Sequence, residues 1–391
     1  MSPATVATST TYTAVGRGTQ RKGFYAAGLF WAFYSNGANA GWEFSNDGIT
    51  WDGAFTPIGA CIHGPRFSVW FDGTYVHYVR YNYFSIFYRR GIPEDDGSIN
   101  WSAVEQTVNE GSISDYYDYP YISIDSNGYA WIGAPRTISF VCTPYILKNA
   151  NNDGTWTTDF ATELSAIEAT IWLISPVPLT DGKVYVIYCR HHELPLGKLY
   201  DGGFGGEENN LADYDIEIGQ HFSAVADGDD VHFTYNKDRK NQIRHNERVW
   251  GVGWNVNDVL VQDNVEEFCG PALSIDTVND ELYCFWTDIG TDHVYYKKYS
   301  SGSWDVDPTD WIDESTDAIR RDDLISSYYQ DYGGDIGLLY STKEGSPYNV
   351  KFDYLTLVAG AGWTGKRSGM TNPAEIDGVP VTNIAKVMGV A

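Results

Sequence analysis

The most concentrated group of reactive side chains in the sequence is Arg190-His191-His192-Glu193. A histidine changes its protonation state near neutral pH and can act as a general base or acid, while a neighbouring arginine can bind the carboxylate of an acidic sugar. Metal binding is less favoured, because adjacent residues of an extended strand point to opposite faces. A structural or solvated role for both histidines is the alternative interpretation.

Further arginine, tyrosine and histidine residues stand where predicted β-strands begin or end. In a blade of antiparallel strands, the start of the first strand and the end of the second lie at the same edge, so these side chains are expected to share one face of the molecule. The candidate ligand-binding residues on that face are Arg21, Arg66, Arg80, Tyr117, Tyr119, Arg136, Arg190 and His221. The candidate catalytic residues are Arg190, His191, His192 and Tyr119.

Such a face is unexpectedly basic for a chain with 26 Lys and Arg against 52 Asp and Glu. Guanidinium groups bind carboxylate or sulfate through two parallel hydrogen bonds, and aromatic rings can stack on sugar rings. The pattern therefore favours an anionic glycan as the ligand. The alternative is that these arginines pair with the abundant carboxylates as ordinary surface ion pairs.

A repeat of about 50 residues sets the positions of these side chains. Short turns of Gly, Asp or Asn precede an apolar, aromatic run at Gly28, Gly73, Gly128, Gly182, Asp230, Asp280 and Gly334. An aromatic residue follows about two dozen residues after each of the first six turns, at Trp51, Trp101, Trp156, Phe204, Trp254 and Trp304. Both features in phase predict an all-β propeller of seven blades, and a count of six or eight would require one misassigned unit.

The two ends of the chain lie outside this repeat. The last unit lacks its aromatic turn, and Val6–Val15 is predicted to supply the missing strand, because closing the ring removes exposed strand edges. We therefore expect residues 1–358 to form the propeller. Residues 359–391 are rich in Gly and Pro and too short for a core of their own, which predicts an attachment or oligomerisation tail, with a frayed end as the alternative.

One of the turns resembles a known motif. Ser45-Asn46-Asp47-Gly48-Ile49-Thr50-Trp51 is similar to the Asp box of the sialidase-like, BNR-repeat propellers, with one residue fewer between Asp and Gly. Weaker copies stand in the same phase at 96–101, 152–156 and 301–304. In that family the box is a structural turn between the outer strands of a blade, so the resemblance implies the propeller fold and not an activity.

That family includes glycosidases, polysaccharide lyases and non-enzymatic sugar binders. For a sialidase, the resemblance implies three arginines around a carboxylate, and the candidates are Arg21, Arg66 and either Arg136 or Arg190; no motif identifies the Tyr/Glu pair. For a related lyase it implies His, Tyr and Arg residues, and the candidates are Arg190, His191, His192, Tyr117 and Tyr119. Separately, residues 371–390 resemble short segments of phage and virus-like surface proteins.

Composition excludes several classes of function. The net charge of −26 opposes binding to nucleic acid or to anionic membranes, and no apolar stretch is long enough to cross a bilayer. The five cysteines show no metal-ligand spacing and are expected to be buried free thiols. No cofactor or metal is expected, and a structural calcium ion has no support in the sequence. The N-terminus does not read as a secretion signal, so we expect an extracellular or virion-surface protein exported without one.

Three functions follow as hypotheses. The first is a non-enzymatic, glycan-binding propeller on a virus-like particle or phage tail, attached to virion proteins or sister subunits through residues 359–391. The second is a lyase or glycosidase acting on acidic polysaccharide. The third is a purely structural propeller.

Overall fold

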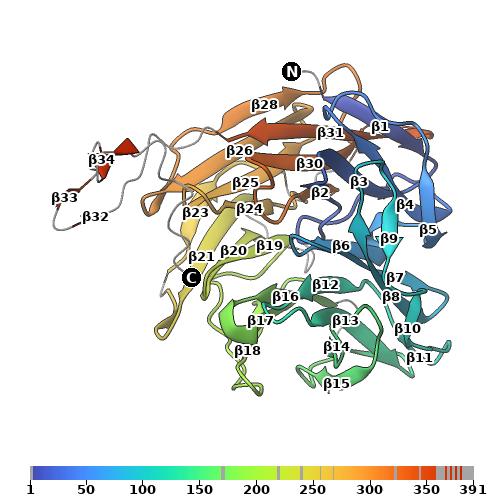
Figure 1. Ribbon diagram of the computed structural model, residues 1–391. Helices are drawn as coiled ribbons and strands as arrows, with labels where there is room; N and C mark the ends of the chain where they lie inside the picture. The colour runs from blue at the N-terminus through green and yellow to red at the C-terminus, as the bar shows by residue number, and fades with distance from the viewer. Residues whose placement is uncertain are drawn as a thin grey trace.

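Seven antiparallel sheets follow one another around a central axis in the computed structural model (Figure 1). The structure describes residues 3–168, 172–217, 221–237, 241–255, 257–266, 268–320, 324–342 and 345–357, with short pieces of the tail at 366–367, 370–371, 375–376 and 379–380. The fold is an all-β, seven-bladed propeller. The predicted fold class and blade count are confirmed.

Each blade runs outward from an innermost strand, and blades 1 to 7 follow the chain order. Blade 1 consists of β2 (Gly23–Ala26), β3 (Leu29–Ser35), β4 (Asn39–Ser45) and β5 (Thr56–Ala60). Blade 2 consists of β6 (Phe67–Phe71), β7 (Val76–Asn82), β8 (Ser85–Pro93), β9 (Ile99–Trp101) and β10 (Gln106–Asn109). Blade 3 consists of β11 (Asp115–Tyr117), β12 (Tyr121–Ile124), β13 (Ala130–Ile138), β14 (Val141–Asn149) and β15 (Thr158–Glu163). Blade 4 consists of β16 (Trp172–Pro178), β17 (Val184–Arg190) and β18 (Leu196–Tyr200). Blade 5 consists of β19 (Phe222–Asp227), β20 (Asp230–Lys237), β21 (Gln242–Val249), β22 (Gly253–Trp254) and β23 (Val259–Gln262). Blade 6 consists of β24 (Ala272–Asp276), β25 (Glu281–Asp288), β26 (His293–Ser300), β27 (Ser303–Trp304) and β28 (Thr309–Asp313). Blade 7 consists of β29 (Ile325–Ser327), β30 (Asp335–Thr342), β31 (Tyr348–Thr356) and the N-terminal strand β1 (Ala4–Ser9).

The N-terminal strand closes the ring, as predicted. β1 pairs with β31 in antiparallel register, and the two strands lie side by side in Figure 1. Val6 is buried in the same apolar cluster as Val350 and Phe352 of β31. The strand ends at Ser9 rather than at Val15, because the chain then leaves the edge of blade 7 and runs toward the central axis.

The aromatic residues of the repeat act as wedges between blades. Each packs against an aromatic ring of the preceding blade, at centroid distances of 5.2 to 6.0 Å. The pairs are Trp51–Phe352, Trp101–Trp42, Trp156–Tyr88, Phe204–Phe160, Trp254–Tyr185 and Trp304–His245. Aromatic pairs contribute roughly 0.5–1.5 kcal/mol beyond their buried area. Because one such pair lies at each of these blade interfaces, the spacing of the aromatic residues in the sequence matches the spacing of the interfaces.

The segment Gly16–Lys22 fills one end of the central channel and touches several blades. The Gln20 side-chain amide donates to the carbonyls of Pro65, just before blade 2, and of Pro120, between β11 and β12 of blade 3, at 2.8 and 3.4 Å. The hydroxyls of Ser223 and Ser326 donate to the carbonyls of Gly18 and Gln20, at 3.0 and 2.6 Å. Small inner-strand residues leave room for this segment, which we call the plug.

Two local features differ from the regular repeat. Blade 4 has three strands among the described residues, and the glycine-rich segment at 202–206 follows β18 where other blades carry a further strand. In blade 1 the turn that resembles an Asp box joins β4 to β5, the expected place. There the Asp47 carboxylate accepts hydrogen bonds from the amides of Ile49 and Thr50, at 2.8 and 2.7 Å.

The cysteines are free and buried, as predicted. Of residues 359–391 the structure describes only the short pairs β32 (Lys366–Arg367) with β33 (Met370–Thr371) and β34 (Glu375–Ile376) with β35 (Val379–Pro380). The predicted attachment role of the tail otherwise lies outside the described residues. Within the part of the chain that the structure describes, no helix has the length and apolar character to cross a membrane.

Candidate functional site

The propeller has two unlike faces. The leading face is the side on which the innermost strands begin and the second strands end. The turn face is the opposite side, where a turn joins the first strand of each blade to the second. The sequence-predicted site residues belong to the leading face, and the structure places each of them as follows.

Arg21 lies inside the channel rather than at its mouth. Its guanidinium donates to the carbonyls of Leu273 and Ala224, at 2.9 and 3.2 Å, and to the Ser327 hydroxyl, at 3.1 Å. Burial lowers the pKa of Arg21 to about 10. The side chain therefore ties the plug to blades 5, 6 and 7, and it is not presented to a ligand.

Three other predicted residues are used by the blades themselves. Arg80 is buried and pairs through two nitrogens with the Glu105 carboxylate. The Arg136 guanidinium donates two hydrogen bonds of 2.9 Å to Asp115, which is the surface ion pair that we weighed as the alternative. Tyr117 is buried between Arg136 and Tyr145, and burial raises its pKa to about 12.

Two further predicted residues lie apart from the rest. Arg190 forms a 3.4 Å ion pair with Glu193, three residues later, and lies over the Trp172 ring. His221 is fully buried, next to Phe268. Neither contacts Arg66 or Tyr119 in the described structure.

Arg66 is the exception among the predicted arginines. Its Nε lies 3.6 Å from the Asp118 carboxylate, too far for a hydrogen bond, and this buried Nε has no hydrogen-bond partner among the described residues. The guanidinium lies 5.0 Å from the centre of the Tyr81 ring. Burial raises the pKa of Asp118, and Arg66 offsets part of that rise. Arg66 is thus a partly exposed cation with a loose partner.

Tyr119 lies beside this ion pair. Burial and the Asp118 carboxylate raise the pKa of Tyr119, while Arg66 and Arg17 lower it in part. Its backbone has φ of 44°, a left-handed conformation that is rare for a bulky residue. Backbone strain of this kind gathers at ligand-binding and catalytic sites.

His191 adds a neutral imidazole from blade 4. Burial lowers its pKa, and His192 and Arg17 lower it further. Its Nε2 is buried and finds no hydrogen-bond partner in the part of the chain that the structure describes. His192, adjacent and exposed, has φ of 52°.

We call this set the leading-face cluster: Arg17, Arg66, Tyr81, Asp118, Tyr119 and His191. It joins the plug to blades 2, 3 and 4. Three of its members were predicted from sequence, and Arg17, Tyr81 and Asp118 were not named among the candidates. Arg17 could have been suspected from its place next to the segment at 19–22, but nothing in the sequence shows that Asp118 meets Arg66.

A cavity of about 860 Å³ opens on the turn face. Its wall is made by the turns of blades 2 to 7, and it includes Trp70, Asp72, Asp125, Asp181, Asp227 and Tyr329. Tyr329 packs on Trp70 and lies against Arg21, so the plug closes the channel behind this wall. The cavity is lined by carboxylates and not by cations.

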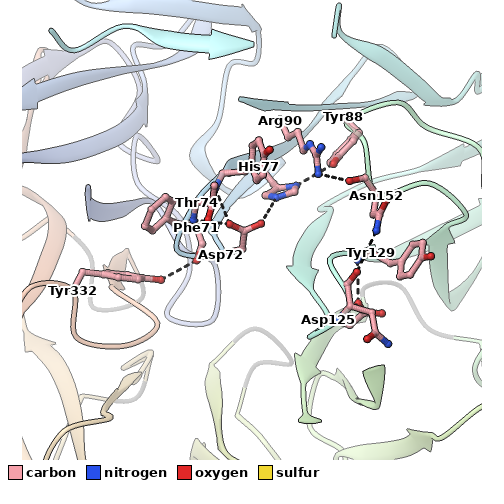
Figure 2. A network of polar contacts seen from close by, with 12 residues as sticks. Phe71, Asp72, Thr74, His77, Tyr88, Arg90, Asp125, Tyr129, Asn152 and Tyr332 are labelled. Carbon is pink, nitrogen blue, oxygen red and sulfur yellow. Dashed lines mark hydrogen bonds and ion pairs between the residues drawn. The ribbon is translucent and has the colours of Figure 1, made fainter. Parts of the chain in front are cut away.

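Two of the carboxylates of this cavity, those of Asp72 and Asp125, are used by local hydrogen bonds (Figure 2). Asp72 accepts from the amides of Thr74 and Tyr75, at 2.8 and 2.7 Å, and its second oxygen lies 3.0 Å from His77 Nε2. The other ring nitrogen of His77 lies 3.0 Å from the Tyr88 hydroxyl, and burial lowers the pKa of the histidine. Neutral His77 therefore bridges Asp72 and Tyr88 as a structural clamp.

The same pattern recurs in blade 3. Asp125 accepts from the amides of Asn127 and Tyr129, both at 3.0 Å, and from the Trp131 indole, at 2.8 Å. These are turn-forming bonds of the kind that Asp makes with its own backbone. Among the described residues, no group of three or more His, Cys, Asp or Glu side chains is arranged to hold a metal ion.

Comparison with known proteins gives a fold and no family. No protein-family model matches the sequence, and no curated protein matches it. Many solved structures match the chain in fold, and the following three are among them.

An ulvan lyase of a polysaccharide lyase family, bound to -[GlcA(1-4)Rha3S]-, is 11% identical with a TM-score of 0.54, over 90% of this chain and 96% of its own. The polysaccharide lyase Uly1 is 9% identical with a TM-score of 0.52, over 87% and 90%. AofleA from Arthrobotrys oligospora is 10% identical with a TM-score of 0.51, over 77% and 88%. The chain is similar to these propellers in fold, and at such identities the likeness carries no residue roles.

Proposed function

We propose that the protein binds an anionic glycan at the leading-face cluster. The observation that carries this proposal is the state of Arg66, whose buried Nε has no hydrogen-bond partner and whose carboxylate partner is loose and has a raised pKa. A ligand carboxylate or sulfate could replace Asp118 and form the two parallel hydrogen bonds that Asp118 does not form. Tyr81 and Tyr119 supply ring faces next to that anion.

The likeness to the ulvan lyase supports the choice of ligand class. The saccharide bound to that protein, -[GlcA(1-4)Rha3S]-, carries both a uronate carboxylate and a sulfate ester. The turn face offers no comparable site, because its cavity presents carboxylates that would repel such a chain. We therefore place the proposed ligand on the leading face.

Calorimetric titration with a sulfated, uronate-containing oligosaccharide tests the proposal. We expect Arg66→Gln to weaken binding at least about tenfold, because a charge-assisted hydrogen bond contributes about 1.5–3 kcal/mol. Arg136→Gln is the matched control, since that guanidinium is already saturated by Asp115. Equal affinity for the desulfated, carboxyl-reduced glycan, or an Arg66→Gln variant that binds like wild type, would refute the proposal.

A lyase is the second candidate, and the state of His191 favours it. A neutral imidazole with a buried, unpartnered Nε2 could remove the proton α to a uronate carboxylate, while Tyr119 could give a proton to the leaving glycosidic oxygen as the β C–O bond breaks. The products would be a new reducing end and an unsaturated uronate. Ultraviolet absorbance of that product would rise with wild type and not with His191→Ala; no rise with either would leave a binding protein.

The setting of the protein is a separate proposal. A virion or phage surface, and attachment through residues 359–391, rest on the sequence of the tail. Removing the residues after 357 should leave glycan affinity unchanged and abolish association between chains or with virion proteins, as measured by light scattering. Unchanged association would refute the attachment role.

A further inference from the structure

The bulky residues with left-handed backbones all lie on the leading face of blades 2 to 4. Among the described residues these are Tyr83, Phe84, Tyr119, Phe140 and His192, with φ of 45°, 76°, 44°, 74° and 52°. The other non-glycine residues with positive φ are Ala, Ser, Asn or Asp. Asn, Asp and His adopt this conformation more often than other types, so the four aromatic residues are the outliers. The placement of the five is therefore not a general property of the turns in this chain.

Two of these sites are tight hairpin tips. Tyr83-Phe84 joins β7 to β8, and Ser139-Phe140, with φ of 49° and 74°, joins β13 to β14. Two-residue turns with both φ values positive normally take Asn-Gly, because those residues adopt the conformation with little strain. Aromatic residues there need another reason.

Packing does not supply that reason. Phe140 is 96% exposed and Tyr83 is 83% exposed, so neither ring stabilises the core. Ile113, on the loop before β11, is 78% exposed. Contiguous exposed apolar surface of this kind marks an interaction site.

These residues lie on neighbouring segments of blades 2 and 3. The Phe84 ring lies 5.4 Å from the Tyr116 ring, and the Ser139 amide donates to the Ser114 carbonyl at 2.8 Å, which joins the tip of blade 3 to the loop that carries Ile113. We call this surface the aromatic ridge: Tyr83, Phe84, Ile113, Tyr116 and Phe140. It runs across blades 2 and 3.

The ridge is continuous with the leading-face cluster. Tyr81, over which Arg66 lies, interacts with the backbone of Phe84 and with Tyr116. The hydroxyls of Ser112 and Ser114 give the ridge a polar flank. A sugar chain fits this mixture, because its C–H faces stack on the negative face of an aromatic ring while its hydroxyls meet polar neighbours.

We infer that the aromatic ridge binds further sugar units of an extended glycan chain whose anionic unit occupies the leading-face cluster. The inference rests on the proposed function and adds the length of the ligand and the direction in which it runs. Glycan binding at the ridge would also explain the strained hairpin tips, because the left-handed backbone would hold their aromatic rings away from the blade and toward the ligand.

The test compares a disaccharide and an octasaccharide of the same sulfated, uronate-containing glycan, titrated into the full chain. We expect wild type to bind the octasaccharide about tenfold more tightly than the disaccharide. The double variant Tyr83→Asn/Phe140→Gly should lose that gain and keep its disaccharide affinity. Its melting temperature should equal or exceed that of wild type, because Asn and Gly suit the turns. Val306→Asn, at a residue that is 90% exposed and lies elsewhere, should change neither affinity.

The outcomes separate the two proposals. If wild type binds neither oligosaccharide, the proposed function fails. If the disaccharide binds but the octasaccharide gains nothing, or the double variant keeps the gain, the ridge inference alone fails. If the double variant instead abolishes self-association in sedimentation, or binding to zwitterionic lipid vesicles, with no change in octasaccharide affinity, the ridge is an interface with a second copy or a membrane, and the inference is overturned.

Discussion

The two faces of this propeller are built from different kinds of turn. On the turn face, Gly73, Gly128 and Gly182 take the left-handed positions, and Asp side chains bond the neighbouring amides. On the leading face of blades 2 to 4, tyrosine, phenylalanine and histidine occupy left-handed positions. The first arrangement makes stable turns, and the second displays side chains.

The two kinds of turn differ in their conformational free energy. A bulky residue in the left-handed region costs about 1–3 kcal/mol, whereas a glycine there costs little. Domains of this kind have net stabilities of only about 5–15 kcal/mol, so several strained residues on one face are a large fraction of the total. Their location is consistent with the proposed glycan binding at the leading face and with a stabilising role for the turn face.

Charged side chains are also paired differently on the two faces. On the turn face, Asp72 and Asp125 are bonded to neighbouring amides and to His77 or Trp131, and Asp181 is paired with Lys183. The saturated arginines Arg80 and Arg136 belong to blade structure. Arg66 alone among the predicted arginines keeps a buried, unpartnered nitrogen.

Removing the Arg21 side chain should have the largest effect, because Arg21 holds the plug that separates the two faces. Arg21→Met would remove the donor to the buried carbonyls of Leu273 and Ala224, leaving Leu273 only the Ser327 hydroxyl at 3.5 Å, at about 1–3 kcal/mol for each unsatisfied group. We expect the free energy of unfolding to fall by about 4 kcal/mol or more in chemical denaturation.

Arg21→Lys is the control for that variant. It keeps the charge but lacks the fork of donors that reaches several blades, so its stability should lie between the other two. A Met variant as stable as wild type would show that the plug does not depend on these bonds.

Changing Asp72 should lower stability and leave binding intact. Burial acts to raise the pKa of Asp72, but His77 and the amides of Tyr75 and Thr74 lower it overall. Its stabilising contribution is therefore present above the ordinary carboxyl pKa and is lost as the pH falls through its lower folded value. Asp72→Ala should cost about 2 kcal/mol at neutral pH and progressively less below about pH 4, by thermal denaturation across pH.

Arg66→Gln should do the opposite, with weaker glycan binding and unchanged stability. The two faces thus separate stability from binding in one pair of variants. An Asp72→Ala variant that weakens glycan binding as much as Arg66→Gln does would remove the distinction.

Lowering the pH should strengthen anionic glycan binding by a smaller amount. The pKa of His191 lies below its ordinary value and that of Asp118 above its own, so both groups take up protons on the acid side of neutrality. Each proton makes the cluster more positive, and the sulfate of the ligand stays charged. We expect affinity to rise roughly fivefold as the pH falls from about 6.5 toward about 3.8, the interval bounded by the ordinary pKa values of the two groups.

His191→Gln should reduce that pH dependence without abolishing binding at neutral pH. Titrations at constant ionic strength measure it. Affinity that falls on acidification in wild type would contradict the assignment of these two groups to the site.

Much of the fold could be predicted because its signals are local and periodic. The repeated aromatics mark the blade interfaces, because each packs against a ring of the preceding blade. The closing N-terminal strand followed from the incomplete last unit. The end of that strand at Ser9 could not be predicted, because the path of the plug depends on contacts with distant blades.

The site was harder to predict for the same reason. Arg17 and Arg21 look alike in sequence, but Arg21 enters the channel while Arg17 influences Tyr119 and His191. Whether an arginine is saturated depends on a carboxylate elsewhere in the chain, such as Glu105 for Arg80. The sequence identifies residue types on a face, and only the fold decides which of them remain available.

The most direct test of the division between the faces is the crystal structure of the protein with a sulfated, uronate-containing octasaccharide. We predict density for an anionic group on Arg66 beside Tyr119, continuing over Tyr83 and Phe140, with the turn-face cavity free of sugar. Density in the cavity lined by Asp72 and Asp125, with none at Arg66, would contradict the account.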